Sequence, residues 1–247
     1  MPRSGFPRII RRTTAVAGGL AAAALLTAAL VGLDDARHAA AAERAVLIPP
    51  PALDAPKAPG PVQTAVVAGG CFWGVQAVYQ HVRGVREARS GYAGGDQATA
   101  DYQAVSAGRT DHAESVEIRF DPGEISYGEI LRIYFSVVHD PTQRDRQGPD
   151  VGRQYRSNVF YVDDAQKRIA QAYIDQLTRV KVFGGAIATR VDPLPAFYPA
   201  ESYHQDFLLK NPTHPYIVIN DLPKIDNLKR VFPALYREQP VTTEKTN

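Results

Sequence analysis

The chain of 247 residues contains one cysteine, one methionine and one tryptophan. The single cysteine, Cys71, excludes a framework of internal disulfides. Met1 is the only methionine, so a form that lost its N-terminus would have no thioether for oxidants to attack. Any sulfur chemistry of such a form would depend on Cys71 alone.

A strong excess of charge is also missing. The formal net charge is +2, and residues 1–42 carry five basic and two acidic side chains. Without that segment the net charge falls to about −1, which argues against nucleic acid or an anionic membrane as the partner. A monomer without metal is expected.

The N-terminus has the pattern of an export signal. Four arginines precede the uncharged segment 15–33, and the small residues 39–42 suit cleavage after Ala42. Arg11-Arg12 hints at twin-arginine export, and the absence of a later cysteine next to this segment excludes a lipoprotein. We expect an exported, periplasmic or extracytoplasmic protein, which would be membrane-anchored if the signal stayed uncleaved.

The rest of the chain predicts one catalytic domain, because its length is sufficient for a single core. Six prolines between residues 49 and 61 indicate a linker without helix or central strand. The predicted segments are an export signal (1–42), a Pro-rich linker (43–62), the domain (63–236) and a polar tail (237–247).

Alternating apolar runs and turn signals predict an α+β fold, a two-layer sandwich of a mixed sheet and packed helices with a ferredoxin-like core. Ser126 and Glu129 form a capping-box pattern. The long polar loop 139–156 is typical of a functional segment, and residues after Asn211 are expected to form a Pro-punctuated tail. Strands are expected over 64–68, 85–92, 115–120, 158–162 and 187–191, and helices over 72–82, 127–138, 163–180 and 201–210.

Cys71 lies in the sequence Gly-Gly-Cys-Phe-Trp-Gly, between a predicted strand and a predicted helix. Backbone N–H groups and the helix dipole at such a turn favour a thiolate. Phe72 and Trp73 offer an apolar wall beside the sulfur. A buried structural cysteine is the alternative, but paired glycines at a turn favour a reactive one.

Several polar residues are candidates to act with Cys71. Glu114 begins a strand, Tyr92 lies in a glycine-rich loop, and Asp150 and Tyr155 lie in the long polar loop. Each residue also has a structural explanation without a catalytic role: the carboxylates could be solvated surface charges, and the tyrosines could be ordinary core residues. The chain lacks the second cysteine motif of a zinc deaminase, and it has no zinc-protease, phosphate-loop or serine-hydrolase motif.

A series of motifs over roughly residues 65–215 resembles peptide methionine sulfoxide reductase of the A type. The motifs appear in that family's order. They are Gly-Cys-Phe-Trp-Gly (70–74), Gly-Tyr-Ala-Gly-Gly (91–95), His-Ala-Glu (112–114), His-Asp-Pro (139–141), Gln-Tyr-Arg-Ser (154–157), Phe-Tyr-Pro-Ala-Glu (197–201) and His-Gln (204–205).

The resemblance implies a role for each candidate. Cys71 would attack the sulfoxide sulfur and become a sulfenic acid, while Glu114 would protonate the sulfoxide oxygen as general acid. Tyr92 and Tyr155 would donate hydrogen bonds to that oxygen. Asp150 would order the polar side of the site. As the remaining implied roles, Phe72 and Trp73 would hold the S-methyl group and select the S epimer.

One departure from the family pattern concerns regeneration. Many members carry resolving cysteines near the C-terminus, and this chain has none. The resemblance to single-cysteine members implies an external thiol, such as a thioredoxin-like protein, as reductant, and oxidised proteins or peptides as substrates. No other cofactor is expected.

Two other kinds of function remain open on the sequence. Cys71 with His204 and Asp206 would suit a cysteine hydrolase or transferase, and a thiol peroxidase is a further enzyme of this kind. An exported peptide-binding module using Phe72 and Trp73 is the non-enzymatic alternative.

Overall fold

The computed structural model describes Met1 and residues 44–243. Apart from Met1, the predicted export signal lies outside the described residues. Among the described residues, no helix has the length and apolar character needed to cross a membrane.

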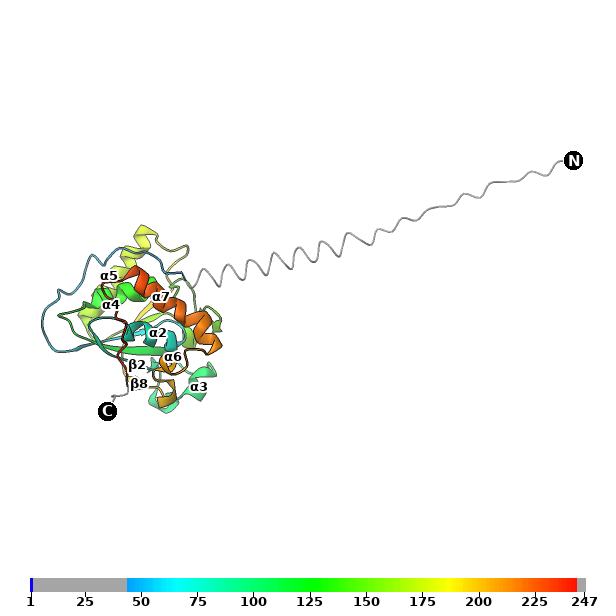
Figure 1. Cartoon of the computed structure of the whole chain (residues 1–247), viewed down its shortest axis with the longest axis horizontal. Coiled ribbons are helices and arrows are strands. Elements are labelled where there is room, and N and C mark those ends of the chain that lie inside the picture. Colours follow the sequence, from blue (N-terminus) through cyan, green and yellow to red (C-terminus); the bar gives the residue numbers. More distant parts are fainter. Residues whose placement is uncertain (2–43, 244–247) are drawn as a thin grey trace. The chain divides into compact units, whose positions relative to one another are not determined.

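A curled six-stranded sheet forms the centre of the fold (Figure 1). Its strand order is β7-β6-β1-β3-β2-β8, and all neighbours are antiparallel except β6 and β7, which are parallel. The mixed sheet confirms the predicted α+β class. The strands are β1 (Gln63–Ala68), β2 (Val85–Ala93), β3 (Ala113–Phe120), β6 (Asn158–Tyr161), β7 (Arg190–Pro193) and β8 (Phe197–Pro199).

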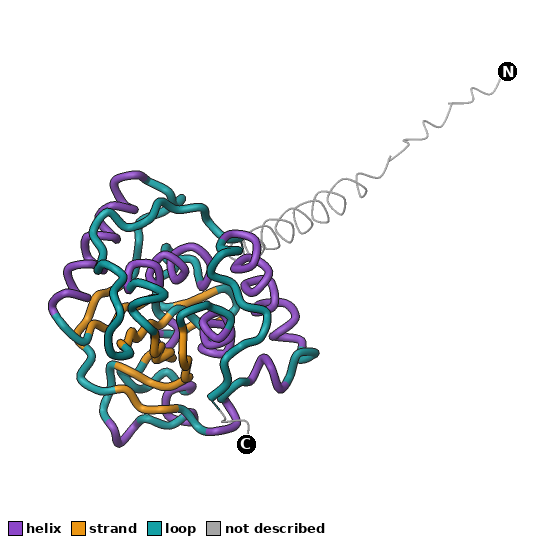
Figure 2. Tube along the Cα trace, turned by 60° about the vertical axis from the view of Figure 1, so that its left-hand side comes forward, coloured by secondary structure: helices purple, strands orange, loops and turns teal. Residues whose placement is uncertain are grey.

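Helices pack on the sheet and enclose the main apolar core (Figure 2). Residues 65–68 of the central strand β1 are all buried, as expected for a strand covered on both faces. The helices are α2 (Phe72–Gln80), α3 (Tyr102–Ser106), α4 (Tyr127–Ile133), α5 (Asp164–Val180), α6 (Phe207–Lys210) and α7 (Leu222–Val231). The π-helices are η2 (Tyr134–Val138) and η5 (Ile217–Asp221), and the 3-10 turns are η1 (Gln97–Thr99), η3 (Arg153–Tyr155) and η4 (Ser202–His204).

The N-terminal end of α4 is tied to the Pro-rich segment. The predicted capping box is present: Ser126 Oγ accepts from the Glu129 backbone N–H at 3.1 Å, and Glu129 accepts in return from the Ser126 N–H at 3.0 Å. Asp54 accepts from the Gly128 N–H at 2.8 Å. Residues 44–62 contain no helix or strand, yet the carboxylate of Asp54 fixes part of them to the domain.

The C-terminal region differs most from the sequence-based expectation. Residues after Asn211 were expected to form a tail, whereas they contain η5 and α7. Pro223, which suggested a break, lies in the first turn of α7, where a missing N–H costs nothing. The helix expected over 201–210 is also wrong as one unit: Asp206, with φ of 57°, separates η4 from α6.

The remaining differences are shifts of bounds and short elements that were not expected, among them α3 and β8. The helix expected over 127–138 is α4 continued as η2. The last strand expected at 187–191 is β7, at Arg190–Pro193. Within the polar loop, β4 (Arg146–Gln147) and β5 (Asp150–Val151) form a short hairpin.

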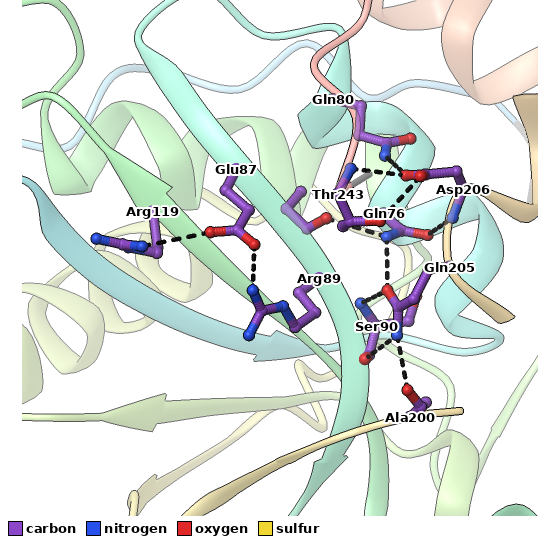
Figure 3. Close-up of polar contacts among 11 residues, drawn as sticks. Gln76, Gln80, Glu87, Arg89, Ser90, Arg119, Ala200, Gln205, Asp206 and Thr243 are labelled. Atoms are coloured by element: carbon purple, nitrogen blue, oxygen red, sulfur yellow. Dashed lines mark hydrogen bonds and ion pairs between the residues drawn. The ribbon is translucent and has the colours of Figure 1, made fainter. Parts of the chain in front are cut away.

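A buried amide network fastens α2 to the segment before α6 (Figure 3). Gln76 Nε2 donates to Gln205 Oε1 and to the Ala88 carbonyl, both at 3.0 Å, and Gln76 Oε1 accepts from the Asp206 N–H at 3.0 Å. Gln205 Oε1 also accepts from the Ser90 N–H at 3.0 Å. Gln205 Nε2 donates to the carbonyls of Ser90, at 2.9 Å, and of Ala200, at 3.0 Å. Both amides thus use every donor they have, which fixes the helix that follows Cys71.

Candidate active site

Cys71 lies in the tight connection between β1 and α2, immediately before the first residue of the helix. Gly70 has φ of +91°, and a Cβ there would lie 2.6 Å from the Gln147 side chain. Only glycine adopts this conformation without strain and leaves room for that contact. The paired glycines therefore let the chain turn closely enough to place the thiol at the helix start.

A cavity of about 220 Å³ opens beside the thiol. It is smaller than the sites that hold drug-sized ligands, which begin at about 300 Å³, and it suits a single side chain. The residues that line it are Cys71, Phe72, Trp73, Tyr102, Glu114, Asp150, Tyr155, His214 and Tyr216. Six of the seven residues predicted from sequence are thus brought together, and Tyr92 is not among the lining residues.

Glu114 is the buried acid of this cavity. It lies on β3, the residue is 2 % exposed, and Oε2 accepts from the Phe72 backbone N–H at 3.0 Å. Burial raises the pKa of Glu114 to about 8, against the lowering effect of the Phe72 hydrogen bond, and Asp150 and Asp221 raise it further. Glu114 is therefore mainly protonated near neutral pH and can give up a proton.

The protonation of Cys71 differs from the expectation drawn from its turn. Burial raises the pKa of the Cys71 thiol well above its usual value, and the charges of Glu114, Asp221 and Asp150 add to this effect. The Trp73 backbone N–H, which hydrogen-bonds the thiol, acts in the opposite direction but is weaker. The prediction that the helix start favours thiolate in the free protein is wrong because desolvation outweighs the backbone N–H.

Asp150 and Tyr155 come from the polar loop, as predicted, at β5 and η3. Asp150 accepts a short hydrogen bond from the Tyr216 hydroxyl. Burial raises the pKa of Asp150, although this hydrogen bond and Lys224 lower it. Tyr216 was missed in the sequence because it lies in the segment taken for a tail.

Tyr92 faces another partner. It pairs with Glu114 across β2 and β3, but its hydroxyl donates to Glu201 Oε2 at 2.8 Å. Glu201 Oε1 accepts from the Tyr102 backbone N–H at 2.9 Å. Glu201 thus links Tyr92 to Tyr102, whose ring lines the cavity, and neither this link nor Tyr102 was anticipated.

The apolar wall is built around Trp73. Its ring stacks on Phe207 with centroids 3.7 Å apart and an interplanar angle of 7°. Trp73 Nε1 donates to His204 Nδ1 at 3.1 Å. Because His204 is bound to Trp73, and the Asp206 carboxylate is bound to Gln80 and Thr243, these residues do not form a relay of Cys71, His204 and Asp206. The hydrolase alternative is not favoured.

Two further observations concern possible metal sites and a second cavity. Among the described residues, no cluster of three or more His, Cys, Asp or Glu side chains is arranged to hold a metal ion. A larger cavity, of about 540 Å³, lies between α5 and the Pro-rich segment, and none of the residues around Cys71 lines it.

A lone thiol, a protonated carboxyl group and several tyrosines around an aromatic pocket define a thiol-dependent enzyme site. Residues 63–235 match the family model described as peptide methionine sulfoxide reductase. The chain belongs to this family.

Similar proteins from several organisms agree with the family model. "Peptide methionine sulfoxide reductase MsrA 2" of Mesorhizobium japonicum is 59% identical, over 76% of this chain and 96% of that protein. A protein of the same name from Synechocystis is 53% identical, over 78% and 92%.

Solved structures of two relatives show the same fold. Mxr1 of Saccharomyces cerevisiae in reduced form superposes with a TM-score of 0.56 at 32% identity, over 66% of this chain and 92% of that one. Methionine sulfoxide reductase A of Corynebacterium diphtheriae gives 0.54 at 29% identity, over 70% and 90%.

Proposed function

We propose that this protein is an oxidoreductase that reduces methionine sulfoxide to methionine at Cys71. The observation that carries the proposal is the juxtaposition of the buried thiol with Glu114, a carboxyl group kept protonated by its surroundings, in a cavity the size of one side chain. Membership of the family supports the same reaction.

The proposed chemistry transfers one oxygen atom. The protonated carboxyl of Glu114 gives its proton to the sulfoxide oxygen, which makes the substrate sulfur electrophilic. The Cys71 thiol passes its proton to the Glu114 carboxylate formed in that step and attacks the substrate sulfur, so that a bond forms between the two sulfur atoms. The hydroxyl then passes from the substrate sulfur to the Cys71 sulfur as the bond between the two sulfur atoms breaks; methionine leaves with the electron pair, and Cys71 becomes a sulfenic acid. The substrate gains two electrons and Cys71 loses two.

The proposal also gives roles to the other residues of the cavity. Phe72 and Trp73 surround the S-methyl group, and the fixed direction of the polar groups selects the S epimer. Tyr155 and Tyr102 are the hydroxyl donors available to the oxygen, since both line the cavity. Tyr92 then has an indirect role: its hydroxyl holds Glu201, which in turn holds the backbone of Tyr102.

Regeneration needs a thiol from another molecule, because the chain has no second cysteine. The external thiol attacks the sulfenic sulfur, water leaves, and a mixed disulfide forms. A second thiol then releases Cys71 and keeps the disulfide. A thioredoxin-like protein suits both steps, and no prosthetic group is needed.

Separated epimers of a methionine sulfoxide peptide test the reaction. Without reductant, we expect the S epimer to yield one methionine per protein, and with excess dithiothreitol, continuous turnover. Cys71→Ser, checked for an unchanged melting temperature, should yield neither. Equal reaction with both epimers, or none with either, would contradict the proposal.

We also propose that the protein is exported and acts as a monomer outside the cytoplasm. The arginines and the uncharged segment at the N-terminus support export. N-terminal sequencing of the protein from an extracytoplasmic fraction is expected to give a chain starting at Glu43. A start at Met1 in that fraction would contradict cleavage.

A further inference from the structure

A buried ion pair lies beneath the first turn of α2, outside the set of residues that line the cavity. Asp221, the last residue of η5, is fully buried, and Lys224 of α7 has a side chain 7 % exposed. Lys224 Nζ donates to Asp221 Oδ1 at 3.2 Å. The pair sits one helical turn from Cys71, at the level of Gly74.

Gly74 is in direct contact with the pair. A Cβ at Gly74 would lie 2.1 Å from Asp221 Oδ1 and 3.0 Å from Lys224 Nζ. The distance to Asp221 is too short for a real side chain, and the one to Lys224 would be a tight contact, so glycine lets the carboxylate reach the backbone of this turn. The helix that starts at Cys71 thus rests on a charged group through its third residue.

The pair is not explained by stability. Replacing a buried ion pair by apolar side chains of similar volume is often neutral or stabilising, because two desolvated charges cost about as much as their attraction returns. The other oxygen of the carboxylate, Asp221 Oδ2, is buried and makes no hydrogen bond with the described residues. A carboxylate left partly unsatisfied beside a nucleophile indicates a functional constraint.

We propose that Asp221 and Lys224 are positioning residues of the reductase site. Lys224 holds the Asp221 carboxylate against Gly74, and the carboxylate fixes the first turn of α2. Its negative charge also helps Cys71 and Glu114 to keep their protons until substrate binds. The proposal rests on the reductase function, but its central test does not.

The electrostatics of the site agree with this geometry. Burial is the main cause that raises the pKa of Cys71, and Asp221 adds to it. Burial likewise dominates the raised pKa of Glu114, to which Asp221 also contributes. Burial raises the pKa of Asp221 itself, and Lys224 lowers it, so the ammonium favours the charged carboxylate.

Other charged or titratable groups face the same space from every element around it. They must be held constant when the pair is tested. They are Tyr102 of α3, Glu114 of β3, Asp150 of β5, Tyr155 of η3, His214, and Tyr216 next to η5.

Alkylation of the lone thiol by iodoacetamide, followed over pH, tests the proposal. Because Cys71 is the only cysteine, the pH dependence of the rate reports how its thiolate fraction changes with pH. In Asp221→Asn the midpoint should fall by about half a pH unit or more, which is about a threefold gain in thiolate at a fixed pH below the midpoint. Asp226→Asn, an exposed carboxylate on α7, is the matched control and should leave the midpoint unchanged.

Activity gives a second readout. The single-turnover rate of methionine release by Asp221→Asn should begin to decline at a lower pH than the rate of the native protein. The reason is that Glu114 loses its proton more easily when the Asp221 charge is absent. A positioning role predicts a change in this profile with little change in the concentration of peptide that half-saturates the reaction.

Lys224→Met keeps the proposal falsifiable if Asp221→Asn does not fold. Without the ammonium, Asp221 either keeps its charge and raises the alkylation midpoint or takes up a proton and lowers it. Lys229→Met, an exposed change on the same helix, is the control. An unchanged midpoint in a folded variant at Asp221 or Lys224 would overturn the proposal, whereas inactivity with intact midpoint shifts would overturn only the reductase function.

Discussion

The two ends of α2 differ in how their buried polar groups are satisfied. Toward its C-terminal half, Gln76 bonds with Gln205, and both amides use every donor they have (Figure 3). At its N-terminal turn, Cys71, Glu114 and Asp221 are buried, and burial disfavours the charged form of each. The amide network fixes the helix in place. At the other end, burial keeps Cys71 and Glu114 protonated at pH values at which the same groups in water would ionise more readily.

This difference teaches where a substitution should cost stability and where it should cost rate. A fully paired amide network loses hydrogen bonds when one member is removed. A carboxyl group buried at the reactive end costs folding energy whenever it ionises, so its removal should affect chemistry far more than the fold.

The largest effect is expected for Glu114→Gln. We expect the single-turnover rate to fall about 100-fold to 1000-fold, because an amide keeps the shape but gives up no proton. The rate of the native protein should decline as pH rises through about 8, where Glu114 ionises. Rapid-quench measurement of methionine between pH 5 and 10 checks both, and a profile without the alkaline decline would remove Glu114 as the acid.

Glu114→Gln should also change how the stability of the fold depends on pH. The folded-state pKa of Glu114 is raised from 4.5 to about 8, so its contribution to stability is complete below 4.5 and is lost as pH rises toward 8. Denaturant titrations should therefore show the native protein losing stability across this window, with a flatter curve for Glu114→Gln. Parallel curves would argue against a buried, protonated carboxyl group.

Gln205→Ala tests the opposite end of the helix. It leaves the Ser90 N–H, one Gln76 donor and two carbonyls without their partner, so we expect a loss of about 2–4 kcal/mol. The single-turnover rate of the remaining folded protein should change only a few-fold. Gln171→Ala on the exposed side of α5 is the control, and equal losses in both variants would refute the comparison.

A paired substitution of tyrosines gives a smaller effect. Tyr155→Phe removes a hydroxyl that lines the cavity and should slow the chemical step about 10-fold. Tyr92→Phe removes a hydroxyl bound to Glu201 and should slow it less. Rates measured under saturating peptide distinguish them, and a larger loss in Tyr92→Phe would return Tyr92 to the direct role first expected for it.

The smallest effect is expected for Ser126→Ala, far from the reactive end. Loss of the capping box should cost about 1 kcal/mol, as a shift of the denaturation midpoint without a change in rate. Ser126→Thr keeps a hydroxyl that can accept from the Glu129 N–H and donate to Asp54, so it should recover part of the loss. A change in the single-turnover rate would show that the cap also acts on the site.

Local patterns in the sequence were sufficient for much of the fold. Residues 64–68 form a strand because they are a short apolar run, and Ser126 with Glu129 caps α4 as the pattern requires. The helices η5 and α7 were missed because prolines such as Pro223 suggested an irregular tail, whereas η2 was expected as the continuation of α4. The break at Asp206 is fixed by its bonds to Gln80 and Thr243, which no local pattern reveals.

For the site, the motifs predicted the residues that line the cavity better than their electrostatic state. Cys71, Glu114, Asp150 and Tyr155 do line one cavity. The acidity of the thiol was misjudged, because burial comes from the whole fold rather than from the turn. Tyr216 and Asp221 escaped notice for a related reason: Tyr216 bonds to Asp150 and Asp221 packs against Gly74, and both contacts join residues far apart in sequence.

The position of α7 and η5 near the end of the chain has a consequence for biosynthesis. Cys71 leaves the ribosome long before Asp221 and Lys224 do, so a nascent chain carries an open thiol with ordinary acidity. Burial of the sulfur waits for contacts of high sequence separation, which are among the slowest to form. Synthesis and folding of the last segment therefore determine when the Cys71 thiol becomes buried and its pKa rises.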